Sequence, residues 1–301
     1  MFYPDFRKQQ GIALLMAMMV VAIATVTAVS LVHEQSLVVR KTAHIRSSDT
    51  AYLYSVGLED YARLILQKDL KETKVDSLDE DWAVGIPALP IEGGFLAGFM
   101  VDAQSLININ SILNQESEVR FRTLCNNLDV EPDFIPALKD WLDSDEETVD
   151  ADGAEDDYYT GLEQPYRTAN RLMSDISELL LVKGVDIEKY EVLKPFITVL
   201  PITTTINLNT IPAEIYKTMK GAGDADKFIS EREKDPFTNL EDYKNRMNHQ
   251  LPAQGISVSS EFFQASGQVT LGEKTIYVNT LIQRDSKGVT TILSRKLGEF
   301  S

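Results

Sequence analysis

The sequence predicts an α+β fold in which one long N-terminal helix lies on an antiparallel sheet, with a large helical region inserted into the sheet domain. Three observations support this prediction. An uncharged apolar run, residues 12–32, passes into a segment with apolar residues at helical spacing. Stretches rich in β-branched and aromatic residues close the chain. Between these parts, the patterning of residues 111–254 is mostly helical.

The composition is that of a folded protein with a strong acidic bias. Of 301 residues, 44% are hydrophobic and 25% are charged, and the net charge is -17. This charge argues against nucleic-acid binding, because phosphate recognition needs clustered Lys and Arg. The single cysteine, Cys125, excludes an intramolecular disulfide and suits a small core residue. The sequence has no Gly-x-Ser-x-Gly, His-Glu-x-x-His or Walker motif, so we expect a protein that is not an enzyme.

Residues 12–32 are the candidate membrane span. The run contains no charge, and at about 1.5 Å per residue its helix would be roughly 31 Å long, which matches the hydrocarbon core of a bilayer. Arg7 and Lys8 precede it, and positive charge favours the cytoplasmic side. We therefore expect a single-pass membrane protein with a cytoplasmic N-terminus and the bulk of the chain on the far side.

The segment after the span, residues 33–70, contains no proline and one glycine. Its apolar residues recur at roughly helical spacing; they are Leu37, Val38, Ile45, Leu53, Val56, Leu64 and Ile65. Two interpretations follow: one helix running through both segments, half in the membrane and half on a soluble domain, or an anchor followed by a separate helix. Periodicity alone does not choose between them.

The N-terminal region resembles that of type IV pilin-like proteins. The resemblance is carried by Arg7 and Lys8, by Gly11, and by the uncharged run that starts at Ile12. It implies that a prepilin peptidase cuts between Gly11 and Ile12, which removes residues 1–11 as a leader. It also implies methylation of the new N-terminal amine.

One departure from the pilin pattern narrows the resemblance. Most pilin-like proteins carry Glu at the fifth position after the cut, whereas this chain has Met16. A carboxylate in lipid is costly unless it is paired, so its absence suggests a subunit that has no neighbour above it. In this respect the chain is similar to the minor pseudopilin K family of type II secretion.

The resemblance to that family implies a location and a set of partners. It implies the Gram-negative inner membrane, with the bulk of the chain in the periplasm, and a place at the tip of the pseudopilus. There the protein would help to initiate assembly and protein export across the outer membrane. The implied partners are minor pseudopilins of the I and J type, the major pseudopilin filament and the prepilin peptidase.

The pilin-like sheet domain is expected from residues 71–110 and 255–301. Its strand candidates are residues 94–104, 261–271, 274–284 and 289–297. Gly272 with Glu273, and the sequence DSKG at residues 285–288, supply credible hairpin turns between the last three.

Residues 111–254 are expected to form one or two inserted helical modules. A loose repeat, ININSIL at residues 107–113 and INLNTIPAEI at residues 206–215, places two asparagines before Ser111 or Thr210, which we expect to be helix N-caps. Pro212 fits a first helical turn. The pseudopilin K family has such an inserted helical region, so the resemblance covers nearly the whole chain.

Residues 206–243 also resemble a helix-hairpin-helix module of DNA-binding proteins, in which Gly-x-Gly amides approach a phosphate. The sequence GAG at residues 221–223 matches, but Asp224 and Asp226 follow it and would repel a phosphate. We therefore favour a packing module that binds no nucleic acid. The alternative function is a membrane-anchored periplasmic protein that captures DNA or a secreted substrate through this module.

An acidic loop, residues 140–170, is the segment whose residue types most clearly indicate a binding site. Ten of the eighteen residues 140–157 are Asp or Glu. Such clusters of hard oxygen ligands suit Ca²⁺ better than Mg²⁺, which dehydrates reluctantly. The loop is not an EF-hand, because the required glycine and glutamate positions fail when counted from Asp143. A solvated acidic face is the alternative, although interleaved aromatic residues such as Trp141 and Tyr158 favour an ordered loop.

The loop is also similar to the calcium-binding stretch of the pseudopilin K family, in the sequences DWLDSD, GAEDDYY and PYRTAN. The resemblance implies a Ca²⁺ ion held by Asp143, Asp145, Glu155 and Asp156. Asp150 and Asp152 lie in a segment that resembles a length-variable part of the family and are weaker candidates.

Overall fold

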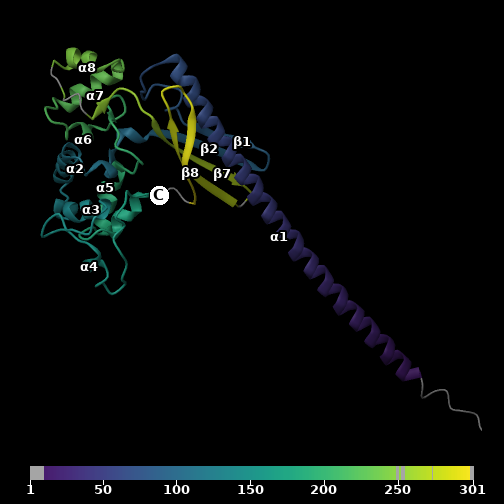
Figure 1. The fold of residues 1–301 in the computed structure, drawn as a ribbon. Helices are drawn as coiled ribbons and strands as arrows, with labels where there is room; N and C mark the ends of the chain where they lie inside the picture. The colour runs from purple at the N-terminus through teal and green to yellow at the C-terminus, as the bar shows by residue number, and fades with distance from the viewer. Residues whose placement is uncertain (1–9, 249–250, 252–254, 273, 299–301) are drawn as a thin grey trace, which may run out of the picture.

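The computed structural model describes residues 10–248, 251, 255–272 and 274–298, and most of the leader lies outside this range. Helix α1 (Gln10–Glu72) runs without a break for 63 residues, so the single-helix interpretation is correct. In Figure 1 its first half projects away from the body and its second half lies on the sheet. By length and composition, α1 is able to cross a membrane, and its most apolar window is not buried by any other part of the molecule.

The sheet is antiparallel, with the strand order β1-β2-β7-β8-β9. Its strands are β1 (Ile86–Ile91), β2 (Gly94–Asp102), β7 (Phe262–Leu271), β8 (Lys274–Arg284) and β9 (Thr290–Leu297). The four predicted strands are present. Strand β1 was not predicted, because Pro87 and Pro90 make its sequence a poor strand candidate. Those prolines also explain its edge position, since proline cannot donate to a central ladder.

Two glycines bring α1 close to the sheet. Gly98 and Gly267 are direct partners on β2 and β7, and the side chain of Leu58 lies over them. A Cβ added to Gly267 would lie 3.0 Å from Leu58 and 3.1 Å from Val278. Helix α1 therefore buries its Ala and Leu side chains against the middle of the sheet rather than at its margin.

Along the chain, the helical region is inserted between β2 and β7. In space it lies on the other side of the sheet from α1 (Figure 1). Its α-helices are α2 (Gln115–Asn127), α3 (Ile135–Leu142), α4 (Asp156–Tyr159), α5 (Ile187–Leu193), α6 (Ala213–Tyr216), α7 (Ala225–Lys234) and α8 (Leu240–Met247). The 3-10 turns are η2 (Ala103–Ser105), η3 (Ile109–Ser111), η4 (Pro132–Phe134), η5 (Ile176–Leu181) and η6 (Lys194–Phe196). These helices are short and long irregular segments join them, so the pattern overstated the helix content.

The loose repeat is a structural repeat. Strand β3 (Ile107–Asn108) pairs in parallel with β4 (Ile197–Thr198), and β5 (Ile206–Asn207) pairs in parallel with β6 (Ile256–Ser257). In the first copy Asn110 exchanges hydrogen bonds with the backbone of Met173, at 2.8 and 3.0 Å. In the second copy Asn209 does the same with Phe237, at 2.8 and 3.0 Å. The second asparagine of each copy therefore binds backbone that is distant in the sequence.

The predicted N-caps in this repeat were wrong. Asn108 caps η3 and Asn114 caps α2, whereas Ser111 ends η3. Thr210 donates its hydroxyl to Asp102, and Pro212 is itself the N-cap residue of α6, one position before the first turn. Asparagine is as good an N-cap residue as Ser and Thr, and here it takes the role that was predicted for them.

A buried polar junction joins the two parts of the chain. Arg284 at the end of β8 pairs with Asp69 of α1 at 2.8 Å and with Asp76. Asp102 at the end of β2 accepts hydrogen bonds from Thr210, Ser260 and Asn207. The sheet, α1 and the second copy of the repeat meet here.

Candidate functional site

The acidic loop brings three of the predicted ligands together. Carboxylate oxygens of Asp143, Asp145 and Glu155 lie within 4.8 Å of one another. Asp143 directly follows α3 as its C-cap residue, and Glu155 directly precedes α4. The cluster therefore forms where the loop leaves one helix and enters the next.

Three oxygens at this place are buried and have no hydrogen-bond partner in the part of the chain that the structure describes. They are Oδ1 of Asp143, Oε1 of Glu155 and Oδ1 of Asn170. Asn170 donates its side-chain N–H to the backbone carbonyl of Asp145 at 2.9 Å, which places it beside the cluster. Its backbone has a positive φ of 44°. Buried acceptors without donors are costly, and three of them on residues of one acidic cluster and its neighbour are typical of a cation site.

Asp140, which was not predicted as a site residue, organises the loop. It is fully buried and accepts hydrogen bonds from the N–H groups of Val149 at 2.8 Å and Ala154 at 2.7 Å. A Cβ at Gly153 would lie 2.2 Å from Oδ2 of Asp140, so this approach requires glycine. Asp140 therefore fixes the stretch that leads into Glu155. Its position among the apolar residues of IPALKDWL could have indicated that Asp140 is buried.

The carboxyls of the site resist ionisation. Burial raises the pKa of Asp143 and of Glu155 above the ordinary range, and the neighbouring carboxylates raise both further. Burial also raises the pKa of Asp140. A bound cation favours the ionised form of a carboxyl, so a divalent ion would relieve the cost at Asp143 and Glu155.

Asp156 lies outside the cluster and has other partners. It pairs with Arg167 at 3.0 Å and accepts a hydrogen bond from the N–H of Thr168 at 3.0 Å. The weaker candidates also lie outside: Asp150 accepts the N–H of Asp152 at 2.8 Å, and both are exposed. The structure thus groups three of the six carboxylates and adds Asn170.

The loop is packed as its aromatic residues suggested. Trp141 contacts Tyr159 edge-to-face with ring centroids 5.4 Å apart, and Tyr166 lies 5.2 Å from Tyr159. Carboxylate, amide and backbone oxygens are the ligands that Ca²⁺ prefers. The residues present therefore fit a calcium ion held by Asp143, Asp145, Glu155 and Asn170.

The segment that resembles a helix-hairpin-helix module does not present free amides to a phosphate at Gly223 and Lys227. Asp224 caps α7 by accepting the N–H of Lys227 at 2.9 Å. The N–H of Gly223, which a phosphate would need, donates to the Tyr216 hydroxyl at 3.1 Å. These two N–H groups at the start of α7 are thus hydrogen-bonded within the chain itself. Cys125 is buried, as expected of a core residue, and burial raises its pKa to about 12.

Comparison with known proteins decides the family. The family model for protein K of the type II secretion system matches residues 105–202, which contain the whole acidic loop. Type II secretion system protein K of Klebsiella pneumoniae is 31% identical over 220 residues, which are 68% of this chain and 67% of that protein. The chain belongs to the protein K family of type II secretion.

The likeness extends over nearly the whole chain. Protein K of Pseudomonas aeruginosa strain PAO1 is 29% identical over 315 residues, covering 97% of this chain and 94% of that protein. A chain in the crystal structure of the GspK-GspI-GspJ complex from enterotoxigenic Escherichia coli is 25% identical, with a TM-score of 0.71. It covers 86% of this chain and is itself covered completely. The chain is thus a pilin-like structural component of the secretion system, a minor pseudopilin.

Proposed function

We propose that the protein is a non-enzymatic subunit at the tip of the type II secretion pseudopilus. There it helps to initiate assembly and export across the outer membrane. The observation that supports this most directly is the helical region of residues 103–261. It forms a separate body beside the sheet (Figure 1), on a fold otherwise typical of a filament subunit. A packed filament leaves little room for such a body along its shaft, whereas the tip leaves it free.

The partners that we propose are the two companion proteins of the I and J type and the major pseudopilin filament. The E. coli relative is named in a complex with GspI and GspJ. Met16, 65% exposed on α1, offers no charge to a neighbouring amine. The protein would therefore accept subunits below it and none above.

Gold labelling of a tag placed in this chain tests the tip position. We expect one label at an end of each sheared pseudopilus. A label that recurs at regular intervals along the shaft would refute the proposal, even if the protein still belongs to the machinery.

We also propose that a prepilin peptidase processes the chain between Gly11 and Ile12 in the cytoplasm, with methylation of the new amine. The bulk of the protein then lies in the periplasm, anchored in the inner membrane by α1. Both residues belong to α1 (Gln10–Glu72), so the mature chain would begin directly with helix.

We propose further that the acidic loop binds Ca²⁺. The unpartnered oxygens of Asp143, Glu155 and Asn170 support this. An ion that binds only the folded state stabilises it by about 2.7 kcal/mol at a hundredfold excess over Kd. For a chain of 301 residues that corresponds to a rise in Tm of roughly 4 °C.

Melting of the full chain in detergent, with Ca²⁺ and with chelator, tests this proposal. Asp145→Ala should abolish most of the calcium increment. Asp156→Asn should lower the Tm equally in both conditions, because its partners are Arg167 and Thr168. Asp152→Asn is the matched control in the same loop. An unchanged Tm of the wild type on chelation would show that the loop is a solvated acidic face.

A further inference from the structure

A band of basic side chains surrounds α1 just beyond the apolar run. Arg40, Lys41 and Arg46 are exposed, and none of them makes an ion pair with any other residue that the structure describes. The acidic residues nearest along the helix are Glu34 and Asp49, which lie on either side of the band. The excess of positive charge is therefore confined to residues 40–46.

The band contrasts with the body of the chain. Only 5 of the 29 basic and 2 of the 46 acidic residues precede residue 47, which leaves 24 basic and 44 acidic residues beyond it, a net charge of -20. An anionic surface would repel that body and attract the band. The charge of the chain is thus separated along α1.

The cations point to all sides of the helix. At about 100° per residue, Lys41 lies about 100° and Arg46 about 240° around the axis from Arg40. A neighbouring protein contacts one face of a helix, whereas a lipid layer surrounds it. The distribution therefore favours a surrounding lipid layer as the binding partner.

The height of the band also fits a membrane surface. With residues 12–32 in the hydrocarbon core, Arg40 and Lys41 lie about 12 and 13.5 Å above its edge. The headgroup layer is roughly 5–8 Å thick, and Arg and Lys side chains extend back toward it. Arg46, about 21 Å above the edge, acts through the diffuse field, whose screening length is about 8 Å.

We propose that Arg40 and Lys41, assisted by Arg46, bind the anionic headgroups of the leaflet through which α1 emerges. The band sets the depth of the helix, and repulsion between the same lipids and the acidic body keeps that body off the membrane. This inference rests on insertion of α1 and is independent of the tip position and of calcium.

The test uses the full chain reconstituted in phosphatidylcholine vesicles that contain phosphatidylglycerol. Electron paramagnetic resonance compares the association of spin-labelled phosphatidylglycerol and phosphatidylcholine with the protein. The variant Arg40→Gln/Lys41→Gln/Arg46→Gln removes the band. The control variant Lys71→Gln/Lys74→Gln/Lys287→Gln removes as many exposed cations from the body.

We expect the wild type and the control to prefer phosphatidylglycerol over phosphatidylcholine. In the band variant the ratio of the two association constants should be at least fivefold lower. A basic residue near an anionic surface contributes about fivefold to association. Arg40→Lys/Arg46→Lys, which keeps the charge, should retain the preference. In about 1 M salt, where the screening length falls to about 3 Å, the preference of the wild type should disappear.

An equal preference in the wild type and the band variant would overturn the proposal. If the band variant also loses co-purification with other pilin-like subunits, the cations serve an acidic protein surface instead. Should the band variant fail to insert, the wild type decides alone: a preference that persists in high salt would contradict an electrostatic origin.

Discussion

Asp102 provides a test of how the helical region is joined to the sheet. Its side chain is 2% exposed and accepts hydrogen bonds from Thr210 at 2.6 Å, Ser260 at 2.6 Å, Asn207 at 3.0 Å and the N–H of Gln104 at 2.7 Å. It forms no ion pair within the described part of the chain. Burial raises its pKa to about 6, and the hydrogen bonds offset only part of that effect.

The raised pKa converts into a dependence of stability on pH. Relative to an ordinary pKa of about 3.9, the shift is about 2 units, or about 3 kcal/mol. Because the folded pKa lies above the unfolded one, the folded state binds more protons between about pH 4 and 6. The free energy of unfolding therefore falls as pH rises through that window and stays lowered above it.

The variant Asp102→Asn removes the charge at a cost. One amide N–H must then face the N–H of either Gln104 or Asn207, which costs about 1–3 kcal/mol. The gain and the loss are of similar size, so at about pH 8 we expect little change in stability. Between about pH 4 and 6, however, the dependence on pH should become flatter by about 3 kcal/mol.

Urea unfolding of the full chain in detergent, followed at several pH values, measures this difference. The fluorescence of Trp82 and Trp141 reports on the sheet and on the helical region respectively. Asp152→Asn, at an exposed position, is the control and should keep the wild-type slope. If Asp102→Asn also keeps that slope, Asp102 is not the titrating group and the reasoning from its burial is wrong.

Three further outcomes follow from the structure. Gly11→Leu should leave the leader attached, which mass spectrometry of membrane-extracted protein would detect; a wild type that still begins at Met1 would contradict processing. Gly57→Ala should raise stability by up to about 1 kcal/mol, since its Cβ meets nothing within 4 Å, whereas Gly267→Ala should lower stability by crowding α1; equal thermal shifts would refute the close approach. Arg284→Met leaves the buried carboxylates of Asp69 and Asp76 without their cation and should lower the free energy of unfolding in denaturant by about 3–5 kcal/mol. A loss under about 1 kcal/mol would mean that these carboxyls are not ionised.

The sequence predicted those parts of the fold that depend on local pattern. The long helix and the four strands follow from residues that neighbour one another, as in the alternation of residues 274–284. Strand β1 was missed because Pro87 and Pro90 obscure it. Its partner is β2, the next strand along the chain, with Gly98 opposite Ile86 and Gly94 opposite Ile91.

The candidate site was predicted in part for a related reason. Asp143 and Asp145 lie close in sequence, and the family resemblance added Glu155. Asp156, which was also predicted as a ligand, lies outside the cluster and pairs at 3.0 Å with Arg167, eleven residues along the chain. Asn170 was not predicted as a ligand. It reaches the loop through a left-handed backbone conformation, which the residue type alone does not predict.

The helical region has a core of its own. Its buried side chains, from Ile107 to Ile256, form one cluster, whereas α1 and the sheet share separate clusters around Leu66 and Val269. A small apolar contact of Ala103, Leu200 and Phe262 lies between them, and the buried polar junction provides further linkage.

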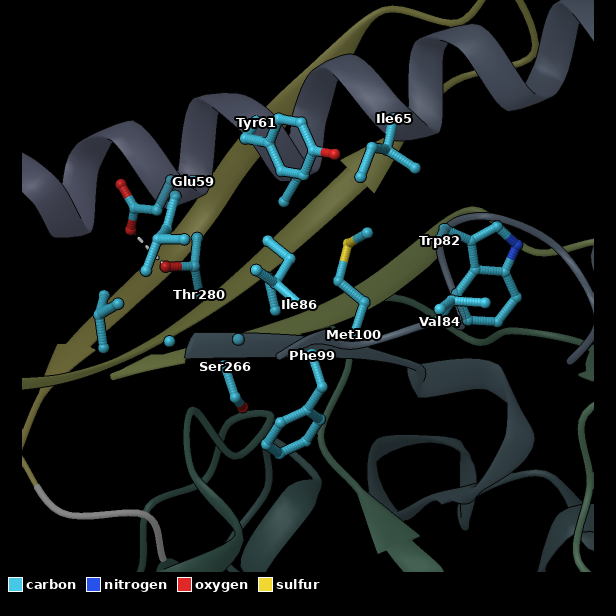
Figure 2. Close-up of a pocket in the computed structure, with 16 residues that line it drawn as sticks. Glu59, Tyr61, Ile65, Trp82, Val84, Ile86, Phe99, Met100, Ser266 and Thr280 are labelled. Atoms are coloured by element: carbon cyan, nitrogen blue, oxygen red, sulfur yellow. Dashed lines mark hydrogen bonds between the residues drawn. The ribbon is translucent and has the colours of Figure 1, made fainter. Parts of the chain in front are cut away.

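The sheet domain also has an exposed apolar surface of its own. An open apolar pocket lies between α1 and β2, with Tyr61 and Ile65 on the helix side and Trp82, Val84 and Met100 along its other wall (Figure 2). Tyr61 and Val84 are 50% and 66% exposed there. This surface does not involve the helical region.

The separation of the cores explains how so large an insertion is compatible with a pilin-like fold. The insertion leaves at the end of β2 and returns at the start of β7, which are paired at Asp102 and Phe263. The sheet therefore closes as if the chain had made a hairpin, and the register of β2 and β7 is unaffected by what lies between them. The candidate calcium site is formed wholly by residues of the inserted region, on the loop that follows Trp141. Loss of the ion should thus loosen the helical region while α1 and the sheet, which carry the membrane anchor, remain folded.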